Sequence, residues 1–359
     1  MSKKPSKKLK LGAVGIGGCW NWGHAEPLLA HPDVEITAVC DIVKAKAEKF
    51  AAAHGIKRVF TDYREMVKLD ELDMVDVCTP NILHSEIAVA ALGAGKHVLT
   101  EKPDAVNVAE AQKMADAASK NKRVLMVMRN NRFNPSVQFM RRYIAAGHMG
   151  EVYTGRCGWI RRRGIPGKGG WFTNKAMSGG GPLIDLGVHY IDVAMWLMGN
   201  PRPVSVTGMT YQKFAHTSVS DSVHSQFGEK KDEGVIDVED LASGFIRFAN
   251  GASLQIEFSW ASNIDTETHF AELRGTKSGC SLTGERELKL FTEIEGTLCD
   301  ISPRLAKPAL STHGQYLAHW IDCVLGRAEP IWTTRQGVDM IKILCAIYES
   351  AASGSEVKL

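Results

Sequence analysis

The sequence predicts an α/β protein with two domains, and three observations support this prediction. The chain has 359 residues, more than a single hydrophobic core usually spans. Its first third alternates short apolar runs with helical segments, which is typical of a doubly wound parallel sheet. After Pro135 long runs alternate apolar and polar residues, which favours a large open, mostly antiparallel sheet. We therefore predict a first domain over residues 9–130 and a second, α+β domain over residues 131–359.

In the first domain, apolar runs and helical segments follow one another along the chain. We expect strands at residues 9–16, 35–40, 59–60, 74–78, 97–100 and 124–128. We expect a short helix that closes at residues 27–31, and further helices or helical turns at residues 43–54, 63–68, 85–94 and 109–119. Right-handed crossovers between such strands bring their carboxyl ends to one edge of the sheet, where these folds bind ligands.

In the second domain, the runs are longer and one helix is apolar throughout. We expect a helix at residues 137–146 and strands at residues 151–160, 204–211, 241–248, 253–260 and 269–275. Three glycines then precede a run that is apolar from Leu183 to Leu197 and so predicts a buried helix. Asp185 and His189 are four residues apart in it, which would place them one turn apart on one face. Because burying an ionisable group without a partner costs several kcal/mol, something must meet them there.

Composition and charge exclude several classes of protein. The formal net charge is +3, and no nucleic-acid-binding motif accompanies the run Arg161 to Arg163, so we expect no nucleic-acid partner. The leading MSKKPSKKLK lacks an apolar core and is expected to be a solvated leader, neither a secretion signal nor a membrane anchor. The longest apolar runs are far below the ~20 residues that cross a bilayer.

Cysteine and histidine spacing argues against disulfides and metals. The eight cysteines are scattered without a C-x-x-C pair, as expected for small buried side chains in the reducing cytoplasm. Four further histidines lack metal-ligand spacing, so we predict no metal site. These are His216, His224, His313 and His319.

A glycine-rich turn follows the first predicted strand, with the sequence Gly15-Ile16-Gly17-Gly18-Cys19-Trp20. Glycines there let the backbone turn tightly and approach a pyrophosphate. Asp41 ends the second strand, where an acid would bind the ribose hydroxyls and repel a 2′-phosphate, which favours NAD over NADP. Lys44 and Lys46 nearby oppose that preference. Trp20 stands where a small residue is usual, so close packing of helix on strand is in question, and a turn without ligand remains an alternative.

Two further strand ends carry polar residues. Cys78-Thr79-Pro80-Asn81, with His84 shortly after, follows the fourth strand, and Glu101-Lys102-Pro103 follows the fifth. A lysine at this edge is well placed to polarise a hydroxyl or carbonyl oxygen beside a nicotinamide. By itself Lys102 could equally be a surface lysine.

Together these motifs resemble the glucose–fructose oxidoreductase / inositol dehydrogenase / rhizopine catabolism (Gfo/Idh/MocA) family over nearly the whole chain. The resemblance also rests on Asn131-Arg132-Phe133-Asn134-Pro135, Asp185-x-x-x-His189, Val238-Glu239-Asp240, and the later runs F-I-R-F-A-N-G and L-R-G-T-K-S-G. It implies an NAD-dependent oxidoreductase in which Lys102, Asp185 and His189 converge on the substrate carbon that faces the nicotinamide.

The chemistry suits these residue types. His189 is the expected base, because the unperturbed pKa of imidazole near ~6.5 allows proton exchange at neutral pH. Lys102 would stabilise the developing alkoxide, and Asp185 would orient the imidazole or bind a substrate hydroxyl. For Asp192, support of the site and a purely structural contact both remain open.

The resemblance also implies the binding residues. The expected cofactor contacts are Gly15, Gly17, Gly18, Cys19, Trp20, Asp41, Thr79, Pro80, Asn81, His84, Glu101, Lys102 and Asn131. The expected substrate contacts are Arg163, Trp171, Asp185 and His189. Trp171 and Phe172 would form an aromatic platform for a sugar or cyclitol ring. Alternatively, Trp171 packs under its loop and the arginines form ion pairs or an interface. Residues 214–236 are expected to form a long mobile loop.

The leading functional hypothesis is an NAD-dependent dehydrogenase that oxidises or reduces a secondary ring hydroxyl of a sugar, glycoside or cyclitol. R-R-R-G-I-P and G-G-G-P-L-I-D are most similar to family members that act on glycosides, which points to C3 of a glucoside. One alternative is an NAD-dependent glycosidase that works by transient oxidation and elimination. Another is a non-enzymatic, cofactor-sensing regulator. The family also implies a homo-oligomer, a dimer or a tetramer, joined through the open face of the second sheet.

Overall fold

The computed structural model describes residues 8–284 and 287–359, and the chain divides into two compact units. The first unit comprises Met1–Met128 and Leu310–Val338, and the second comprises Arg129–Ala309 and Asp339–Leu359. Most of the predicted leader, residues 1–7, lies outside the described residues. The sequence placed residues 310–338 in the second domain, whereas in the structure they pack with the first unit. Tyr316 shows why, because it is fully buried and its hydroxyl donates to the Val127 carbonyl at 2.6 Å.

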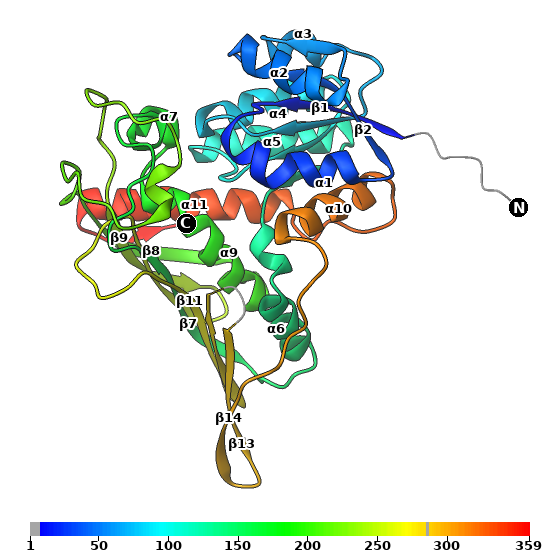
Figure 1. Cartoon of the computed structure of the whole chain (residues 1–359). Coiled ribbons are helices and arrows are strands. Elements are labelled where there is room, and N and C mark those ends of the chain that lie inside the picture. The colour runs from blue at the N-terminus through cyan, green and yellow to red at the C-terminus, as the bar shows by residue number, and fades with distance from the viewer. Residues whose placement is uncertain (1–7, 285–286) are drawn as a thin grey trace, which may run out of the picture. The chain divides into compact units, whose positions relative to one another are not determined.

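The first unit is built on a parallel sheet with the order β3-β2-β1-β4-β5-β6 (Figure 1). Its strands are β1 (Leu9–Val14), β2 (Val34–Cys40), β3 (Arg58–Phe60), β4 (Met74–Val77), β5 (His97–Thr100) and β6 (Leu125–Val127). The strand order reverses between β1 and β4, which is the point where doubly wound sheets bind ligands. This confirms the predicted fold of the first domain.

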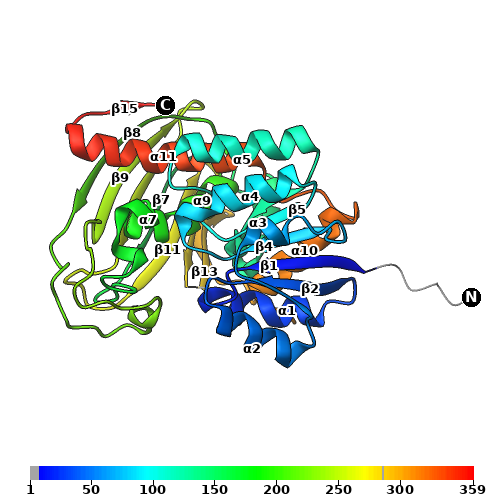
Figure 2. The same ribbon diagram turned by 90° about the horizontal axis from the view of Figure 1, so that it is seen from above.

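Helices cover both faces of this sheet. They are η1 (Trp20–His24), α1 (Ala25–Ala30), α2 (Lys44–His54), α3 (Tyr63–Met66), η2 (Asn81–Leu83), α4 (His84–Gly93), α5 (Val108–Asn121) and α10 (Thr312–Val324). Figure 2 shows α1 and α2 on one side of the strands and α4 and α5 on the other. Right-handed crossovers that run in opposite directions from β1 and β4 produce this arrangement. The segment η1 is a π-helical turn, so the glycine-rich turn leads directly into helix α1.

The second unit is built on a mixed sheet with the order β14-β13-β12-β11-β7-β10-β9-β8-β15. Its strands are β7 (Val152–Ile160), β8 (Pro203–Tyr211), β9 (Leu241–Phe248), β10 (Ser253–Ser259), β11 (Thr268–Gly275), β12 (Ser278–Thr283), β13 (Glu287–Ile294), β14 (Thr297–Ile301) and β15 (Val357–Lys358). Only the pair β7 and β10 is parallel among these described strands, so the predicted, mostly antiparallel sheet is confirmed.

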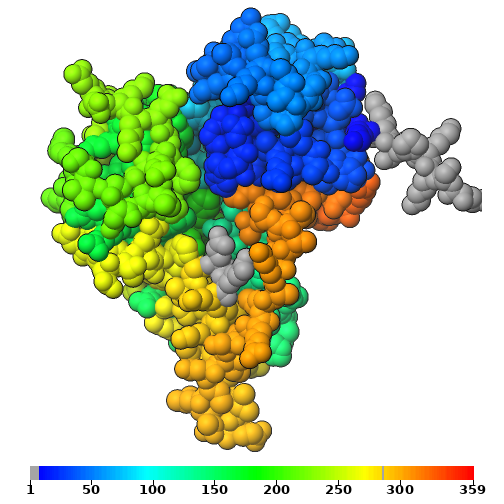
Figure 3. Space-filling view, in the orientation of Figure 1, coloured from blue at the N-terminus to red at the C-terminus, as the bar shows by residue number. Residues whose placement is uncertain are grey.

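The four strands that come last along the chain, β12 to β15, were not predicted from the sequence. Strands β13 and β14 form a hairpin that projects from the rest of the second unit (Figures 1 and 3). Their side chains are mostly exposed, and Leu298 is 87% exposed, so the apolar alternation that marks a half-buried strand is weak here. A two-residue turn, Glu295-Gly296, joins the two strands, and both residues have positive φ, as a type I′ hairpin turn requires.

Seven helical segments of the second unit are η3 (Asn130–Phe133), α6 (Pro135–Ala145), η4 (Trp171–Thr173), α7 (Lys175–Ser178), α8 (Pro182–Asp185), α9 (Gly187–Leu197) and η5 (Val223–Gln226). Helix α11 (Thr334–Ser353) contains the division between the units. Helix α9 lies on one face of the sheet, against β7, β10 and β11. The opposite face carries polar side chains, as the alternation in β10 predicted, with Gln255 and Glu257 exposed in the single chain.

The predicted buried helix is present as two consecutive segments, α8 and α9, which are separated by Leu186. The backbone N–H of His189 donates to the carbonyl of Leu186 at 3.1 Å. Gly187, a poor helix former, begins the second segment. Leu186 keeps right-handed helical dihedral angles, so Asp185 ends α8 and His189 lies in the first turn of α9.

Among the described residues, no helix has both the length and the apolar character to cross a membrane. All eight cysteines are free thiols, which agrees with the interpretation of their spacing. The loop at residues 214–236 contains η5. It is bound to the loop between β7 and η4, because the Lys168 ammonium donates to the Thr217 carbonyl at 2.6 Å.

Candidate functional site

The glycine-rich turn has two kinds of glycine. Gly15 has a φ of +79°, and a Cβ there would lie 2.4 Å from the Cys78 carbonyl oxygen, so only glycine fits between β1 and β4. Gly17 and Gly18 are different, because a Cβ on either would meet no atom of the described residues within 4 Å. They leave open space beside the backbone of the turn. This is the form expected where a pyrophosphate approaches closely.

The loop after β4 offers a polar group at the same sheet edge. The Thr79 hydroxyl is buried and makes no hydrogen bond to any residue that the structure describes. Buried polar groups are normally satisfied, so an orphaned hydroxyl beside the turn is a place where a ligand atom fits. Pro80 and Asn81 follow it, and Asn81 is buried at the start of η2. The residues at this edge therefore fit a dinucleotide.

His84 supports this edge from behind. Its imidazole is fully buried, with Nδ1 2.8 Å from the Pro103 carbonyl and Nε2 2.9 Å from the Thr79 carbonyl. Burial lowers the pKa of His84. Because both nitrogens face backbone carbonyls, His84 links the loops after β4 and β5. The expected contact of His84 with a cofactor stays a prediction.

Asp41 follows β2 at the position expected for recognition of the ribose. Its Oδ1 accepts the backbone N–H of Val43 at 2.8 Å, which orients the carboxylate at the start of the loop. Lys44, which was expected to weaken the preference for NAD, forms an ion pair with Glu48 on the exposed surface of α2 at 3.3 Å.

The Trp20 side chain points into the core, and its expected contact with a cofactor stays a prediction. The indole is fully buried, packs edge-on against Phe50 with ring centroids 4.8 Å apart, and donates to Asp76 Oδ2 at 2.8 Å. The bulky side chain is accommodated at the π-helical turn η1. Close packing of this segment on the sheet is therefore achieved with tryptophan in place of the usual small residue.

The same carboxylate contacts His24, which the sequence analysis missed. His24 is fully buried, with Nδ1 2.9 Å from Asp76 Oδ2 and Nε2 2.9 Å from Glu101 Oε1. Burial alone would lower the pKa of His24, but Asp76 and Glu101 outweigh it and raise this pKa to about 10. A signal was present, because Asp76 lies inside the apolar strand M-V-D-V and a buried charge requires a partner.

Glu101 also points inward and not toward a ligand. Its Oε2 accepts the backbone N–H of Lys102 at 3.0 Å, while its other oxygen meets His24. Burial alone would raise the pKa of Glu101, but His24 outweighs it and holds the pKa well below its usual range. Glu101 thus fixes the backbone of Lys102, and its expected contact with a cofactor stays a prediction. We call Asp76, His24 and Glu101 the buried triad.

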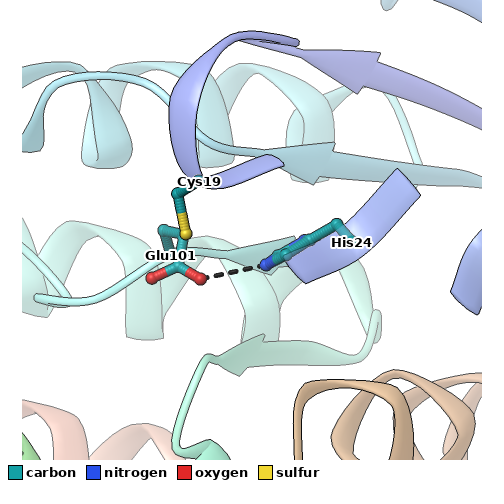
Figure 4. Close-up of side chains that lie close together, drawn as sticks. All are labelled: Cys19, His24 and Glu101. Atoms are coloured by element: carbon teal, nitrogen blue, oxygen red, sulfur yellow. Dashed lines mark hydrogen bonds and ion pairs between the residues drawn. The ribbon is translucent and has the colours of Figure 1, made fainter. Parts of the chain in front are cut away.

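Cys19 joins the buried triad, as Figure 4 shows for Cys19, His24 and Glu101. The ligand atoms of these three residues lie within 4.8 Å of one another, as do those of His24, Asp76 and Cys78. A metal would require thiolates and a neutral imidazole. Burial raises the pKa of both thiols well above its usual value, and both ring nitrogens of His24 already meet carboxylates. The groups are therefore arranged as hydrogen-bonded ion pairs, and Cys19 faces these pairs.

The second unit positions Asp185 through a hydrogen bond from Trp260 and through the packing at the start of α8. The indole N–H of Trp260 donates to Asp185 Oδ2 at 3.0 Å, and both side chains are buried. The helix that carries Asp185 begins at the three glycines. A Cβ on Gly180 would lie 2.0 Å from the Tyr348 hydroxyl, and one on Gly181 would lie 2.1 Å from the Glu239 carbonyl. The glycines are thus required for close packing at the start of α8.

Glu239, from the V-E-D motif, caps this helix. Its carboxylate accepts the backbone N–H groups of Gly181 at 2.9 Å and Leu183 at 3.1 Å, and the Tyr348 hydroxyl at 2.8 Å. Burial raises the pKa of Glu239, although these three donors oppose the shift. The sequence analysis used V-E-D only for the resemblance. The structure shows that it fixes the start of the helix that presents Asp185.

His189 lies beside a cluster of aromatic rings around Trp159. The Trp159 ring centroid lies 6.2 Å from that of His189, and the other neighbouring rings are at 5–6 Å. They belong to His269 at 5.2 Å, His224 at 5.5 Å and Tyr190 at 5.9 Å. We call these five residues the Trp159 cluster. None of them except His189 was expected at a site.

Charged groups border the Trp159 cluster. The Trp159 indole N–H donates to Glu267 Oε1 at 2.8 Å, and the guanidinium of Arg161 lies 4.9 Å over the Trp159 ring. Burial alone would raise the pKa of Glu267, but hydrogen bonds from His224 and Trp159 lower it to about 2. Burial lowers the pKa of Arg161, and the charges of Asp185 and Glu267 oppose this. The second unit therefore combines aromatic faces with fixed charges near Asp185 and His189.

Arg163 holds loops together, and its expected contact with a substrate stays a prediction. Its guanidinium donates to the carbonyls of Arg162 and Ser262 and to Asn263 Oδ1, each at 2.6 Å. The buried arginine of the run is Arg161, which directly follows strand β7 and is 3% exposed. Trp171 stacks on Phe172 with ring centroids 3.9 Å apart, and both rings are half-buried.

Asp192 and Asn131 belong to the second unit. Asp192 accepts two hydrogen bonds from the Arg132 guanidinium, both at 2.7 Å, and its Oδ1 lies 3.3 Å from Arg129 Nε. Of the two roles left open, the structure shows the structural contact. Asn131 is half-buried in η3, and its contact with a cofactor stays a prediction.

Comparisons with known proteins agree with this arrangement. A family model described as an oxidoreductase family with an NAD-binding Rossmann fold matches residues 9–129, and the GFO/IDH/MocA C-terminal domain matches residues 137–280. The D-glucoside 3-dehydrogenase of Escherichia coli (strain K12) is 34% identical over 359 residues, which cover 100% of this chain and 99% of the relative. The levoglucosan dehydrogenase of Pseudarthrobacter phenanthrenivorans is 29% identical over 79% of this chain and 76% of the relative. The crystal structure of an NAD-binding oxidoreductase from Klebsiella pneumoniae has a TM-score of 0.82, with 26% identity over 98% of this chain and 99% of that one.

Proposed function

Because the chain belongs to the Gfo/Idh/MocA family of oxidoreductases, we propose that it is an NAD-dependent dehydrogenase of a secondary ring hydroxyl in a sugar or glycoside. The matched family model describes an NAD-binding fold, so the cofactor is a nicotinamide dinucleotide. Gly17, Gly18 and Thr79 would hold its pyrophosphate side, and Asp41 its ribose. When bound, it supplies the carbon that accepts or returns a hydride.

The observation that carries the substrate class is the Trp159 cluster. A sugar ring has apolar C–H faces and a rim of hydroxyls, so it suits aromatic faces bordered by fixed hydrogen-bonding groups. Trp159 supplies such a face, and Arg161 and Glu267 supply the charges. The whole-length similarity to a D-glucoside 3-dehydrogenase supports a glucoside as substrate and C3 as the reacting carbon.

For the chemistry, we propose that His189 takes the proton of the substrate hydroxyl as hydride leaves its carbon. Lys102 stabilises the developing alkoxide through its positive charge. Asp185, held by Trp260, binds a neighbouring hydroxyl or orients the imidazole of His189. In the reverse direction, the protonated His189 returns the proton to the new alkoxide.

A substrate screen tests the proposed function. Purified protein is incubated with NAD and a panel of free sugars, methyl glucosides, aryl glucosides and inositols, and NADH is followed by absorbance. We expect NADH with glucosides and a 3-keto product by NMR. Release of the aglycone from an aryl glucoside without net NADH would instead support the glycosidase. NAD binding without any turnover across the panel would support the regulator.

Cofactor choice gives a separate prediction. We expect NAD to bind more tightly than NADP, because the Asp41 carboxylate would repel a 2′-phosphate. Asp41→Ala should narrow the difference in Kd between the two cofactors, as measured by fluorescence titration. Asp116→Ala removes the same side-chain type from an exposed position of α5 and should leave the ratio unchanged. Equal affinity of the unaltered protein for NAD and NADP would contradict the assignment of Asp41.

A further inference from the structure

In the first unit, four charged residues follow one another in space, and three of them are buried. Asp76 comes from strand β4, His24 from η1, and Glu101 and Lys102 from the end of β5. His24 lies 2.9 Å from a carboxylate oxygen on each side, and Lys102 follows Glu101 directly in the chain. The signs alternate from Asp76 to Lys102. Their formal sum is zero only when His24 carries its proton.

His24 is the group that makes this arrangement stable. A buried carboxylate without a cation either takes up a proton or draws another cation toward it. If His24 were neutral or absent, Asp76 and Glu101 would remain as two carboxylates in the core. The cationic residue next to Glu101 in the sequence is Lys102, and its charge already helps to lower the pKa of Glu101. Without His24, we expect the ammonium of Lys102 to turn toward Glu101.

Glu101 passes this constraint to the backbone. One of its oxygens meets His24, and the other accepts the backbone N–H of Lys102 at 3.0 Å. The carboxylate therefore fixes the residue from which the lysine side chain starts. The other groups that face His24 do not replace it. Cys78 and Cys19 are thiols whose pKa is raised by burial, and burial lowers the pKa of His313 to about 4, so His313 is neutral at pH 7.

We infer that His24 is a positioning residue for Lys102. Its imidazolium holds Glu101 as an inward-turned carboxylate, and Glu101 holds the backbone of Lys102 so that the ammonium serves the substrate and not the core. This inference rests on the proposed function, because it requires that Lys102 act on the substrate. It adds to that function a residue that contacts neither substrate nor cofactor.

The experiment is a double-mutant cycle between residues 24 and 102, with a methyl glucoside and NAD as substrates. His24→Asn keeps an amide near Asp76 but cannot reach Glu101, whereas the longer side chain of His24→Gln can donate to Glu101. A misplacement of about 1 Å can cost ~10²-fold in rate. We therefore expect His24→Asn to lower kcat by roughly 10- to 100-fold and His24→Gln to lower it less. The KM for the glucoside and the Kd for NAD should change by no more than about three-fold.

The Lys102→Ala background separates positioning from a general loss of structure. If His24 acts through Lys102, His24→Asn should lower kcat by no more than about two-fold once Lys102 is alanine. An equal loss in both backgrounds would overturn the inference, as would a lowered Tm with unchanged kcat per folded molecule. If His24→Asn does not fold, His24→Gln is taken through the same cycle. Failure of the proposed function looks different, because Lys102→Ala would then keep full activity or no glucoside would be oxidised by the unaltered protein.

Discussion

Replacing Lys102 or His189 by alanine is expected to lower kcat by ~10²–10⁴-fold, the usual contribution of a general acid or base. Loss of the Lys102 ammonium removes the charge that stabilises the alkoxide, and loss of the His189 imidazole removes the proton acceptor. The Kd for NAD should stay within a few-fold, because the pyrophosphate and ribose contacts are assigned to other residues. Steady-state kinetics with a methyl glucoside and a fluorescence titration with NAD measure the two quantities.

The double variant and two controls make this result specific. Groups that act together on one oxygen give non-additive losses, so the Lys102→Ala/His189→Ala variant should lose much less than the product of the single losses. Lys113→Ala and His54→Ala remove the same side-chain types from exposed helix positions and should leave kcat unchanged. If His189 is only a packing residue, its loss will lower the Tm and spare kcat per folded molecule. If Lys102 is only a surface charge, its loss will change neither quantity.

The fold of the first unit could be predicted because its signals are local. Apolar runs of strand length, helical segments between them and the glycines after β1 together define a doubly wound sheet. They also place Lys102 and Thr79 at the carboxyl edge. Side-chain direction at that edge is not a local property. His84 and Glu101 occupy the predicted positions, yet both turn inward to partners that are distant in the sequence.

In the second unit, the sequence did not predict elements with few buried side chains, or which side chains of a run are buried. The β13–β14 hairpin buries few side chains, so its sequence carries little alternation. Alternation places Arg161 and Arg163 on the same side, so it could not decide which of them is buried. Arg161 directly follows β7, is buried and lies near Asp185, whereas Arg163 bonds to loop carbonyls beyond the strand. The close packing of Gly180 and Gly181 against Tyr348 and Glu239 at the start of α8 is likewise revealed by no local pattern.

Asp192 illustrates the same limit, since its sequence context suited both a role in the site and a structural role. In the structure its carboxylate is buried and accepts two parallel hydrogen bonds from Arg132, at 2.7 Å each. The Arg132 guanidinium also lies 5.4 Å over the ring of Trp196. Breaking such a buried pair by removing one partner leaves the other charge in the core, which typically costs ~3–5 kcal/mol.

We therefore expect Asp192→Ala to lower the free energy of unfolding by about 3–5 kcal/mol in urea denaturation, a loss far larger than its effect on catalysis. Catalytic turnover per folded molecule should change by no more than a few-fold, because Asp192 is engaged with arginines and is not proposed to touch substrate. Removing both charges in Asp192→Leu/Arg132→Met should recover part of the lost stability, since the Arg132 charge is then removed with its partner, while Arg129 still loses its ion pair with Asp192. The matched control is Glu356→Ala, which breaks the exposed ion pair with Arg247 and should cost at most about 1 kcal/mol. If Asp192→Ala is as mild as this control, the stabilising role is wrong, and if it abolishes turnover in a fully folded protein, Asp192 belongs with Asp185 and His189 in the reaction.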